Sequence, residues 1–297
     1  MNNNRMSLTY IFCDIDDFCK ELKINRLPVP GKRNRFTRET ELCTSEIMTI
    51  LVLFHLKGYR TFKWFYCDYV RKHYSQEFPK LVSYNRFVEL IPRVLLPLFA
   101  YLSIQRLGSK SGTFIIDSTA LKVCENKRIH NHKVFAGLAE RGKTSVGWFY
   151  GFKLHLIINE KGEIISFYIT KGNVDDRNEE VIFFLTKNLK GKLFGDRGYI
   201  SQKLFKKLLE RGIKMITKIR RNMKNILMDM TEKLLLRKRA VIESVNEELK
   251  NICQIQHTRH RSVINWMVNI TSGLIAYSFF PKKPSIDLKT GGILVEI

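Results

Sequence analysis

The chain has 297 residues, 44% of them hydrophobic, so it can bury a core in one large domain or two modest ones. This composition excludes a disordered, collagen-like or small disulfide-stapled protein. Lys and Arg number 51 against 28 Asp and Glu, which gives a formal charge of +23. Because such an excess of charge repels itself, we expect a polyanionic partner, with nucleic acid first and an anionic membrane surface second.

Neither the cysteines nor the apolar stretches point outside the cytoplasm. The six cysteines are scattered without a Cys-x2-Cys pair, which indicates thiols in a reducing compartment. The apolar stretch 94–104 contains Pro97 and is shorter than the roughly 20 residues that a bilayer requires. Polar side chains recur along the second stretch, 263–280. We therefore expect a cytoplasmic protein that does not associate with a membrane.

Residues 1–108 have apolar side chains at helical spacing. Helices are predicted over about 44–58, over 62–70 and from Ser83 onward, which together make a small all-helical domain. Such a bundle could contain a helix-turn-helix that binds DNA, although the sequence identifies no recognition helix. A plain packing or dimerisation domain is equally compatible with these residues.

After a linker-like segment at 107–112 the hydrophobic period changes, and residues 109–280 are predicted to form an α/β domain. The predicted elements, in chain order, are a strand at 114–117, a hairpin of 151–159 and 164–170, a helix at 176–190, a strand at 192–196, a helix at 201–211, a strand at 214–219 and a long helix at 230–253. This order predicts a mixed sheet whose later strands join through crossover helices. Residues 281–297 are expected to form a loose tail.

Two carboxylates follow apolar strands in this domain. Asp117 comes after Phe114-Ile115-Ile116, and Asp196 comes after Leu193-Phe194-Gly195. If the two strands are parallel neighbours, at a spacing of roughly 4.8 Å, the carboxylates lie side by side. Adjacent carboxylates repel unless they are protonated or bridged by a cation. In a chain this basic, a bound divalent metal explains the pair best.

A third carboxylate, Glu243, lies on the long predicted helix and shares a face with Arg239 and Lys250. Taken alone, a carboxylate between two cations is typical of a solvated helix face. Together, Asp117, Asp196 and Glu243 can hold two Mg²⁺ ions, or Mn²⁺ in their place, about 3.5 to 4 Å apart. That arrangement serves in-line displacement at phosphorus.

Basic residues surround two of these acids. Residues 187–261 contain 20 Lys or Arg and 7 Asp or Glu, so 20 − 7 gives +13. This excess favours a surface for substrate phosphates over a merely solvated face. The candidate phosphate contacts are Arg197, Lys218, Arg220, Arg221, Lys224, Arg239 and Lys250. Trp148, beside basic residues in a glycine-bounded segment, could stack on an unpaired base, with core packing as the alternative.

These motifs resemble the DDE transposases of bacterial insertion sequences. The resemblance rests on the Asp117 strand, on Asp196-Arg197-Gly198-Tyr199, and on Arg239-x3-Glu243-x6-Lys250. Residues 129–133 and 147–155 are similar, more narrowly, to the insertion sequence 982 family. The resemblance implies a ribonuclease-H-like catalytic core in which Asp117, Asp196 and Glu243 form the metal-binding triad. One departure is Leu236, which stands where the related motif often has a tyrosine.

The same resemblance implies an enzyme that cleaves the terminal repeats of its element and joins the freed 3′-hydroxyls to target DNA. Holding two ends together implies a homodimer or a larger synaptic assembly. Two alternatives stay open on the residues alone. A ribonuclease-H-like endonuclease would cut without joining, and a non-catalytic DNA-binding protein would need neither the metal nor the acids.

Overall fold

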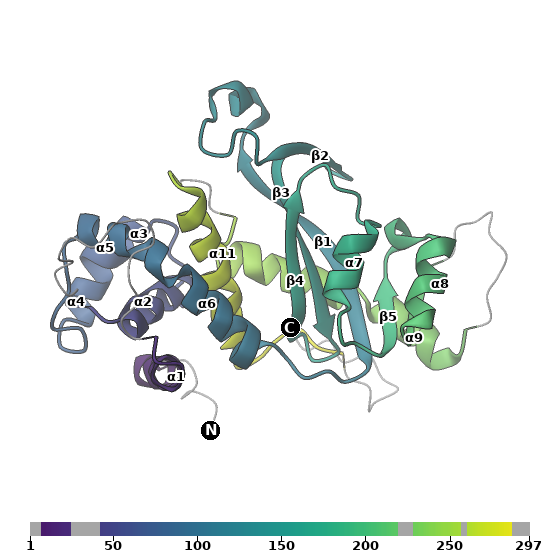
Figure 1. Ribbon diagram of the computed structural model, residues 1–297, viewed down its shortest axis with the longest axis horizontal. Helices are drawn as coiled ribbons and strands as arrows, with labels where there is room; N and C mark the ends of the chain where they lie inside the picture. Colours follow the sequence, from purple (N-terminus) through teal and green to yellow (C-terminus); the bar gives the residue numbers. More distant parts are fainter. Residues whose placement is uncertain (1–6, 25–41, 219–227, 257–259, 287–297) are drawn as a thin grey trace. The chain divides into compact units, whose positions relative to one another are not determined.

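The computed structural model describes residues 7–24, 42–218, 228–256 and 260–286. The chain divides into two compact units (Figure 1). A helical unit comprises Met1–Arg106 with Glu248–Pro281, and a sheet unit comprises Leu107–Glu247 with Lys282–Ile297. Each unit has its own buried apolar core.

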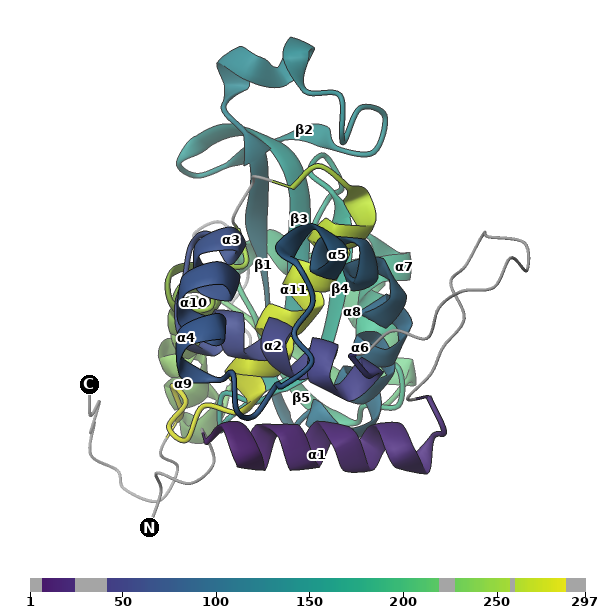
Figure 2. The same cartoon turned by 90° about the vertical axis from the view of Figure 1, so that its left-hand side faces the viewer.

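The helical unit is built around a helix that is apolar on all sides. Its described α-helices are α1 (Leu8–Glu21), α2 (Thr44–Leu56), α3 (Phe62–Trp64), α4 (Arg71–His73), α5 (Tyr84–Leu90), α6 (Leu95–Tyr101) and α11 (Val263–Ser278). Its 3₁₀ and π-helical turns are η2 (Phe65–Val70), η3 (Ile91–Val94), η4 (Leu102–Arg106) and η7 (Glu248–Ile252). Because α2 has no polar face, it is stable only when surrounded, and α1 and α11 pack against it (Figure 2).

The boundaries of this unit differ from the predicted domains at the C-terminal end. Residues 109–280 were expected to form one α/β domain, but Glu248–Pro281 belong to the helical unit. The physical reason is α11, whose Trp266, Ile270 and Leu274 are buried and which contacts α2 and α6. The bundle is therefore completed by a helix that the sequence places far from its other members.

One stretch of this unit, Tyr84–Arg106, is long and apolar enough to cross a membrane by length and composition alone. A core helix passes the same test. Leu98, Tyr101 and Leu102 are buried against the rest of the helical unit, as they would be in a core helix.

The sheet unit contains one mixed sheet. Its strands are β1 (Thr113–Cys124), β2 (Glu140–Thr144), β3 (Gly147–Asn159), β4 (Ile164–Lys171), β5 (Gly191–Gly195) and β6 (Ile213–Thr217). The strand order is β2-β3-β1-β5-β6, and β4 pairs with β3 beyond the end of β2. The β3 strand is antiparallel to β1, β2 and β4, whereas β5 is parallel to both β1 and β6.

Helices cover this sheet, and their bounds are α7 (Glu179–Leu185), α8 (Gln202–Glu210), α9 (Met230–Lys238) and α10 (Val241–Glu247), with 3₁₀ turns η5 (Asn126–Asn131) and η6 (Arg197–Tyr199). Side chains of α7 and α8 join Phe114, Ile116 and Leu193 in one core cluster. The α9 helix contacts β5 and β6, and α10 contacts β1. Four antiparallel strands, β1 to β4, continued by the parallel β5 and β6, with helices packed on them, confirm the predicted ribonuclease-H-like α/β fold.

The strand that carries Asp117 is longer than expected. The sequence predicts that it ends at Asp117, but β1 continues to Cys124 because β3 pairs with it over its whole length after Thr113. The parallel partner β5, in contrast, pairs only with Thr113–Ile115. Asp117 therefore lies inside a strand, at the point where the neighbouring strand stops.

The long helix predicted over 230–253 is interrupted. It forms α9 and α10, separated by turn residues Arg239 and Ala240, and then the π-helical turn η7. The two helices bury their apolar sides against different strands, since α9 contacts β5 and β6 while α10 contacts β1.

The predicted loose tail is packed at its start. The Ile286 backbone N–H donates to the carbonyl oxygen of Glu160 at 2.7 Å, and the Ile286 side chain is buried. The turn between β3 and β4 thus holds the chain as far as Ile286, and residues 287–297 lie outside the described part of the chain.

Gly151 on β3 allows the close packing of β3 against β1 to be tested. It has a φ of +156°, and a Cβ added there would lie 2.1 Å from the Leu121 carbonyl oxygen. Gly147 has a φ of +141° but no atom within 4 Å of an added Cβ. We expect both alanine variants to lose about 1–3 kcal/mol from the backbone conformation. Gly151→Ala should lose a further ~1–3 kcal/mol from the clash. Urea unfolding measures both losses, and equal losses would contradict the close approach of β1 and β3.

Candidate active site

The parallel pairing of β1 with β5 brings two carboxylates together. Thr113 pairs with Lys192 and Ile115 with Phe194, so partners differ by 192 − 113 = 79 positions. The same offset places Asp117 level with Asp196, which directly follows β5. Because side chains alternate along strands, both acids lie on the face opposite the Phe114 and Ile116 cluster.

The charges of the other two acids affect the pKa of Asp117. The pKa of the Asp117 carboxyl is raised to about 7, mainly by burial and also by the negative charges of Asp196 and Glu243. The Ser118 backbone N–H and the positive charge of Arg239 act in the opposite direction on the pKa of Asp117. These influences place the three predicted ligands and Arg239 in one electrostatic neighbourhood.

Neighbouring groups orient two of the predicted ligands. The Asn246 side chain on α10 donates from Nδ2 to Asp117 Oδ2 at 3.1 Å. Asp196 caps the η6 turn and accepts from the Gly198 backbone N–H at 2.7 Å. These donors hold the carboxylates in place in the absence of any ligand.

The side chain of Glu243 lies beside an arginine. Its Oε1 lies 3.6 Å from Arg239 Nη2, and 62% of its side chain is exposed. In the part of the chain that the structure describes, no three His, Cys, Asp or Glu side chains surround a common point. The predicted charge ladder between Arg239 and Glu243 is therefore present, with Glu243 beside Arg239 and not grouped with the other two acids.

Two of the predicted DNA contacts lie beside these acids. Arg197 follows Asp196 directly and is exposed. Gly195 pairs with Thr217, so Lys218, at the end of β6, lies level with Asp196. The edge of the sheet thus carries basic side chains next to its carboxylates.

Arg239, another predicted DNA contact, also lies near Asp117, because its positive charge lowers the pKa of that carboxyl. Lys250 lies in η7, within the helical unit. Trp148 lies near the start of β3, eight positions before Leu156, the residue that pairs with Asp117. Arg220, Arg221 and Lys224 lie outside the described residues.

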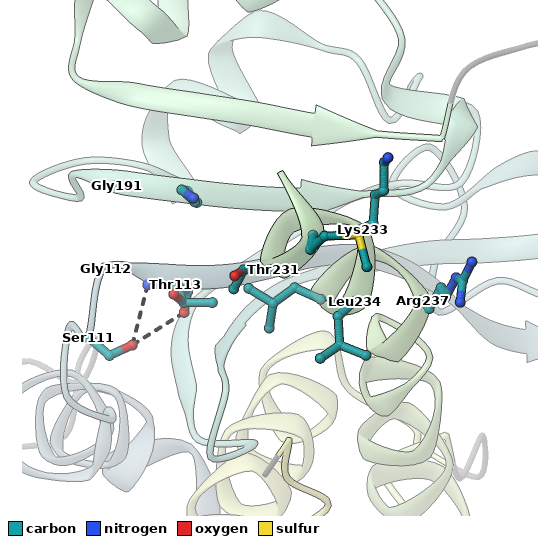
Figure 3. A pocket seen from close by; sticks show the side chains of 11 residues that line it. Ser111, Gly112, Thr113, Gly191, Thr231, Lys233, Leu234 and Arg237 are labelled. Atoms are coloured by element: carbon teal, nitrogen blue, oxygen red, sulfur yellow. Dashed lines mark hydrogen bonds between the residues drawn. The ribbon is translucent and has the colours of Figure 1, made fainter. Parts of the chain in front are cut away.

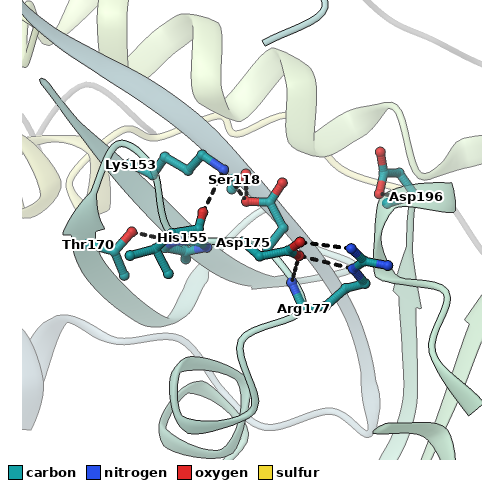
Figure 4. A network of polar contacts seen from close by, with 10 residues as sticks. Ser118, Lys153, His155, Thr170, Asp175, Arg177 and Asp196 are labelled. Atoms are coloured by element: carbon teal, nitrogen blue, oxygen red, sulfur yellow. Dashed lines mark hydrogen bonds and ion pairs between the residues drawn. The ribbon is translucent and has the colours of Figure 1, made fainter. Parts of the chain in front are cut away.

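A second group of polar side chains, which was not predicted from the sequence, lies beside Asp117 (Figure 4). Asp176 Oδ1 accepts from Ser118 Oγ at 2.8 Å and from Lys153 Nζ at 3.0 Å. Asp175 and Asp176 look like helix caps in the sequence, but Asn178 caps α7, and Asp176 binds residues of β1 and β3. The signal for this role lay in Lys153, a lysine inside an otherwise apolar strand.

A pocket of about 890 Å³ lies at the opposite end of the same strands (Figure 3). It is lined by Gly112, Thr113, Gly191 and Lys192, where β1 and β5 begin, together with residues of α9. Asp117 is four residues further along β1, or about 13 Å at the usual rise per residue. This pocket is therefore separate from the carboxylates.

The donor chemistry around Asp117 fits a divalent cation. Carboxylate and amide oxygens are the ligands that hard divalent ions prefer. Among the described residues, Asn246 Oδ1 is buried beside Asp117 and has no hydrogen-bond partner. A cation would neutralise the charge that raises the pKa of Asp117 and would give that oxygen a partner.

The raised pKa of Asp117 predicts an unusual pH dependence for the metal-free protein. The folded state holds the Asp117 proton up to about pH 7, whereas the unfolded chain releases it near the ordinary pKa of 3.8. Wild-type stability should fall, by up to about 4 kcal/mol from this group, as the pH rises from about 4 to about 7. Asp117→Asn should lack this decline in urea unfolding in EDTA, and identical profiles would contradict it.

Asp175 provides a control, because its effect on stability changes with pH in the opposite direction. Its hydrogen bonds and ion pair with Arg177 lower the pKa of the Asp175 carboxyl to about 2. The stability that this group contributes is present above about pH 4 and is lost as the pH falls toward 2. Asp175→Asn should therefore lower stability at neutral pH, where Asp117→Asn raises it.

Comparison with known proteins agrees with the predicted chemistry. The sequence model described as "Transposase DDE domain" matches residues 107–263, which is more than half of the chain. The piggyBac transposase synaptic complex with hairpin DNA is similar in structure, with 14% sequence identity and a TM-score of 0.49, over 90% of this chain and 72% of that chain. No curated protein sequence matches the chain. The chain thus belongs to the DDE transposase domain family.

Proposed function

We propose that this protein is a DNA transposase that cleaves the ends of a mobile element and joins the freed 3′-hydroxyls to target DNA. The observation that carries this proposal is the placement of Asp117 level with Asp196, close enough to Glu243 for its negative charge to raise the pKa of Asp117. Adjacent acids in a chain of formal charge +23 suit a site that holds cations against a phosphate backbone.

In this proposal Asp117, Asp196 and Glu243 hold two Mg²⁺ ions, and Mn²⁺ substitutes for them. When bound, two such ions activate a water or a 3′-hydroxyl and stabilise the leaving oxygen of an in-line displacement at phosphorus. The chain itself orients the ligands, through Asn246 at Asp117 and the Gly198 backbone N–H at Asp196. Glu243 completes the set by turning away from Arg239.

DNA phosphates would be held by the basic groups near the acids. Arg197 and Lys218 flank Asp196, and Arg239 becomes available to a phosphate when Glu243 leaves it. Lys250, Arg220, Arg221 and Lys224 are proposed as further phosphate contacts on the basis of the sequence. Element ends and target DNA would be brought together by a homodimer or a larger assembly.

The narrower assignment rests on sequence motifs. Residues 129–133 and 147–155 support membership of the insertion sequence 982 family, and with it an origin in the bacterial cytoplasm. In the structure these two segments belong to the β1–β3 region of the sheet unit.

Substitution of the three acids tests the proposal. Asp117→Asn, Asp196→Asn and Glu243→Gln should each slow metal-dependent cleavage of DNA that flanks the gene by at least about 10²–10³-fold. DNA affinity in EDTA should be kept, because the acids make no contact that attracts DNA. Mapping of the strand ends on a denaturing gel measures the cleavage.

Glu247→Gln is the matched control, because Glu247 lies one helical turn beyond Glu243 on α10 and is also exposed. It should cleave at the wild-type rate. Full cleavage by Asp117→Asn would overturn the site. Cleavage without joining of pre-cut ends would identify an endonuclease that lacks strand transfer.

A further inference from the structure

The ribbon formed by β2 and the start of β3 carries an exposed tryptophan that the active-site proposal does not use. The ring of Trp148 is 57% exposed, and Val146, in the turn before it, is 92% exposed. Figure 1 shows β2 and the start of β3 at the upper end of the sheet unit. A large aromatic side chain in such a place has no core to join, so its exposure requires another explanation.

Two cations lie against the Trp148 ring. Lys143 pairs with Trp148 across the ribbon, and Arg141 lies two residues earlier on the same face. The Lys143 Nζ is 5.7 Å from the ring centroid, and the Arg141 guanidinium carbon is 5.9 Å away. Both distances are within the range of a cation–π interaction. The ring thus has two positive charges beside it.

The opposite face of the ribbon fixes the direction of Trp148. Gly142 and Phe149 are buried there, and a Cβ added to Gly142 would lie 2.1 Å from the Gly172 carbonyl oxygen. Because this packing leaves no space for a side chain, the ribbon cannot slip by one residue and turn Trp148 inward. The outward position of the ring is therefore built into the fold.

The charge around the ring identifies the partner. Residues 122–148 contain six Lys or Arg and two Asp or Glu, so 6 − 2 gives +4. The six cations are Lys122, Lys127, Arg128, Lys133, Arg141 and Lys143. Lysine is depleted from protein–protein interfaces, whereas an aromatic ring among cations is typical of proteins that stack an unpaired base and neutralise its backbone.

We propose that Trp148, with Arg141 and Lys143, forms a binding site for an unpaired DNA base that is separate from the carboxylates. Eight positions of β3 separate Trp148 from Leu156, which pairs with Asp117, and this corresponds to about 26 Å along the strand. The base that stacks here is therefore not at the bond that is cut. The inference rests on the proposed function only in taking DNA as the substrate.

The test compares two duplexes of one sequence in EDTA, so that no cleavage occurs. One is fully paired, and the other carries a single extrahelical 2-aminopurine, whose fluorescence falls when it stacks on an aromatic ring. Wild-type protein should bind the bulged duplex more tightly and quench it. Trp148→Ala should lose roughly 5- to 100-fold of affinity for the bulged duplex only. Trp148→Phe should keep part of the preference.

Trp64→Ala is the matched control, because Trp64 is 65% exposed and lies on α3 of the helical unit. It should keep the full preference for the bulged duplex. Arg141→Gln and Lys143→Gln should weaken binding to both duplexes and each reduce the slope of log affinity against log salt by about 1.

An unchanged preference in Trp148→Ala, with binding to the paired duplex intact, would overturn this inference and leave the active-site proposal untouched. Absence of binding to any DNA would overturn both. Loss of cleavage in the Asp117→Asn variant, with quenching unchanged, would support the two sites as independent.

Discussion

The parallel pairing of β1 with β5 is the constraint on which the rest of the site depends. It sets Asp117 level with Asp196, the residue that directly follows the end of β5. Burial and the neighbouring charges then raise the pKa of Asp117 to about 7. A protein that only had to fold would gain stability by replacing one of the acids. A cation bound by both acids, as proposed above, would offset this cost.

The two faces of β1 make different contacts at this edge of the sheet. Asp117 points toward α10 and is held by Asn246, whereas the next residue, Ser118, points to the other face and binds Asp176. Lys153 on β3 also donates a hydrogen bond to Asp176. Adjacent residues of one strand thus connect the candidate metal ligands to a network that fixes the strand behind them.

The sequence predicts this site better than it predicts the elements around it. The pairing of Asp117 with Asp196 follows from two apolar strands that each precede an acid. The continuation of β1 to Cys124 was visible in the alternation of buried Leu121 and Val123, but β2 was not, because a polar strand forms only through its pairing with β3.

Two further features depend on contacts that no local pattern reveals. The break after α9 contains neither proline nor glycine, and arises because α9 and α10 pack on different strands. Asp176 reads locally as a helix cap, since its partner Ser118 lies 58 positions earlier in the chain. In both cases the deciding contact is distant in the sequence.

The most direct test of the central claim is a titration of Mn²⁺ into the DNA-free protein, followed by electron paramagnetic resonance. The wild-type protein should bind Mn²⁺, and Asp117→Asn, Asp196→Asn and Glu243→Gln should each weaken or abolish this binding, while Glu247→Gln should leave it unchanged. Equal binding of Mn²⁺ by the wild type and by all three variants would contradict the account, because the acids that the fold brings together would then hold no metal.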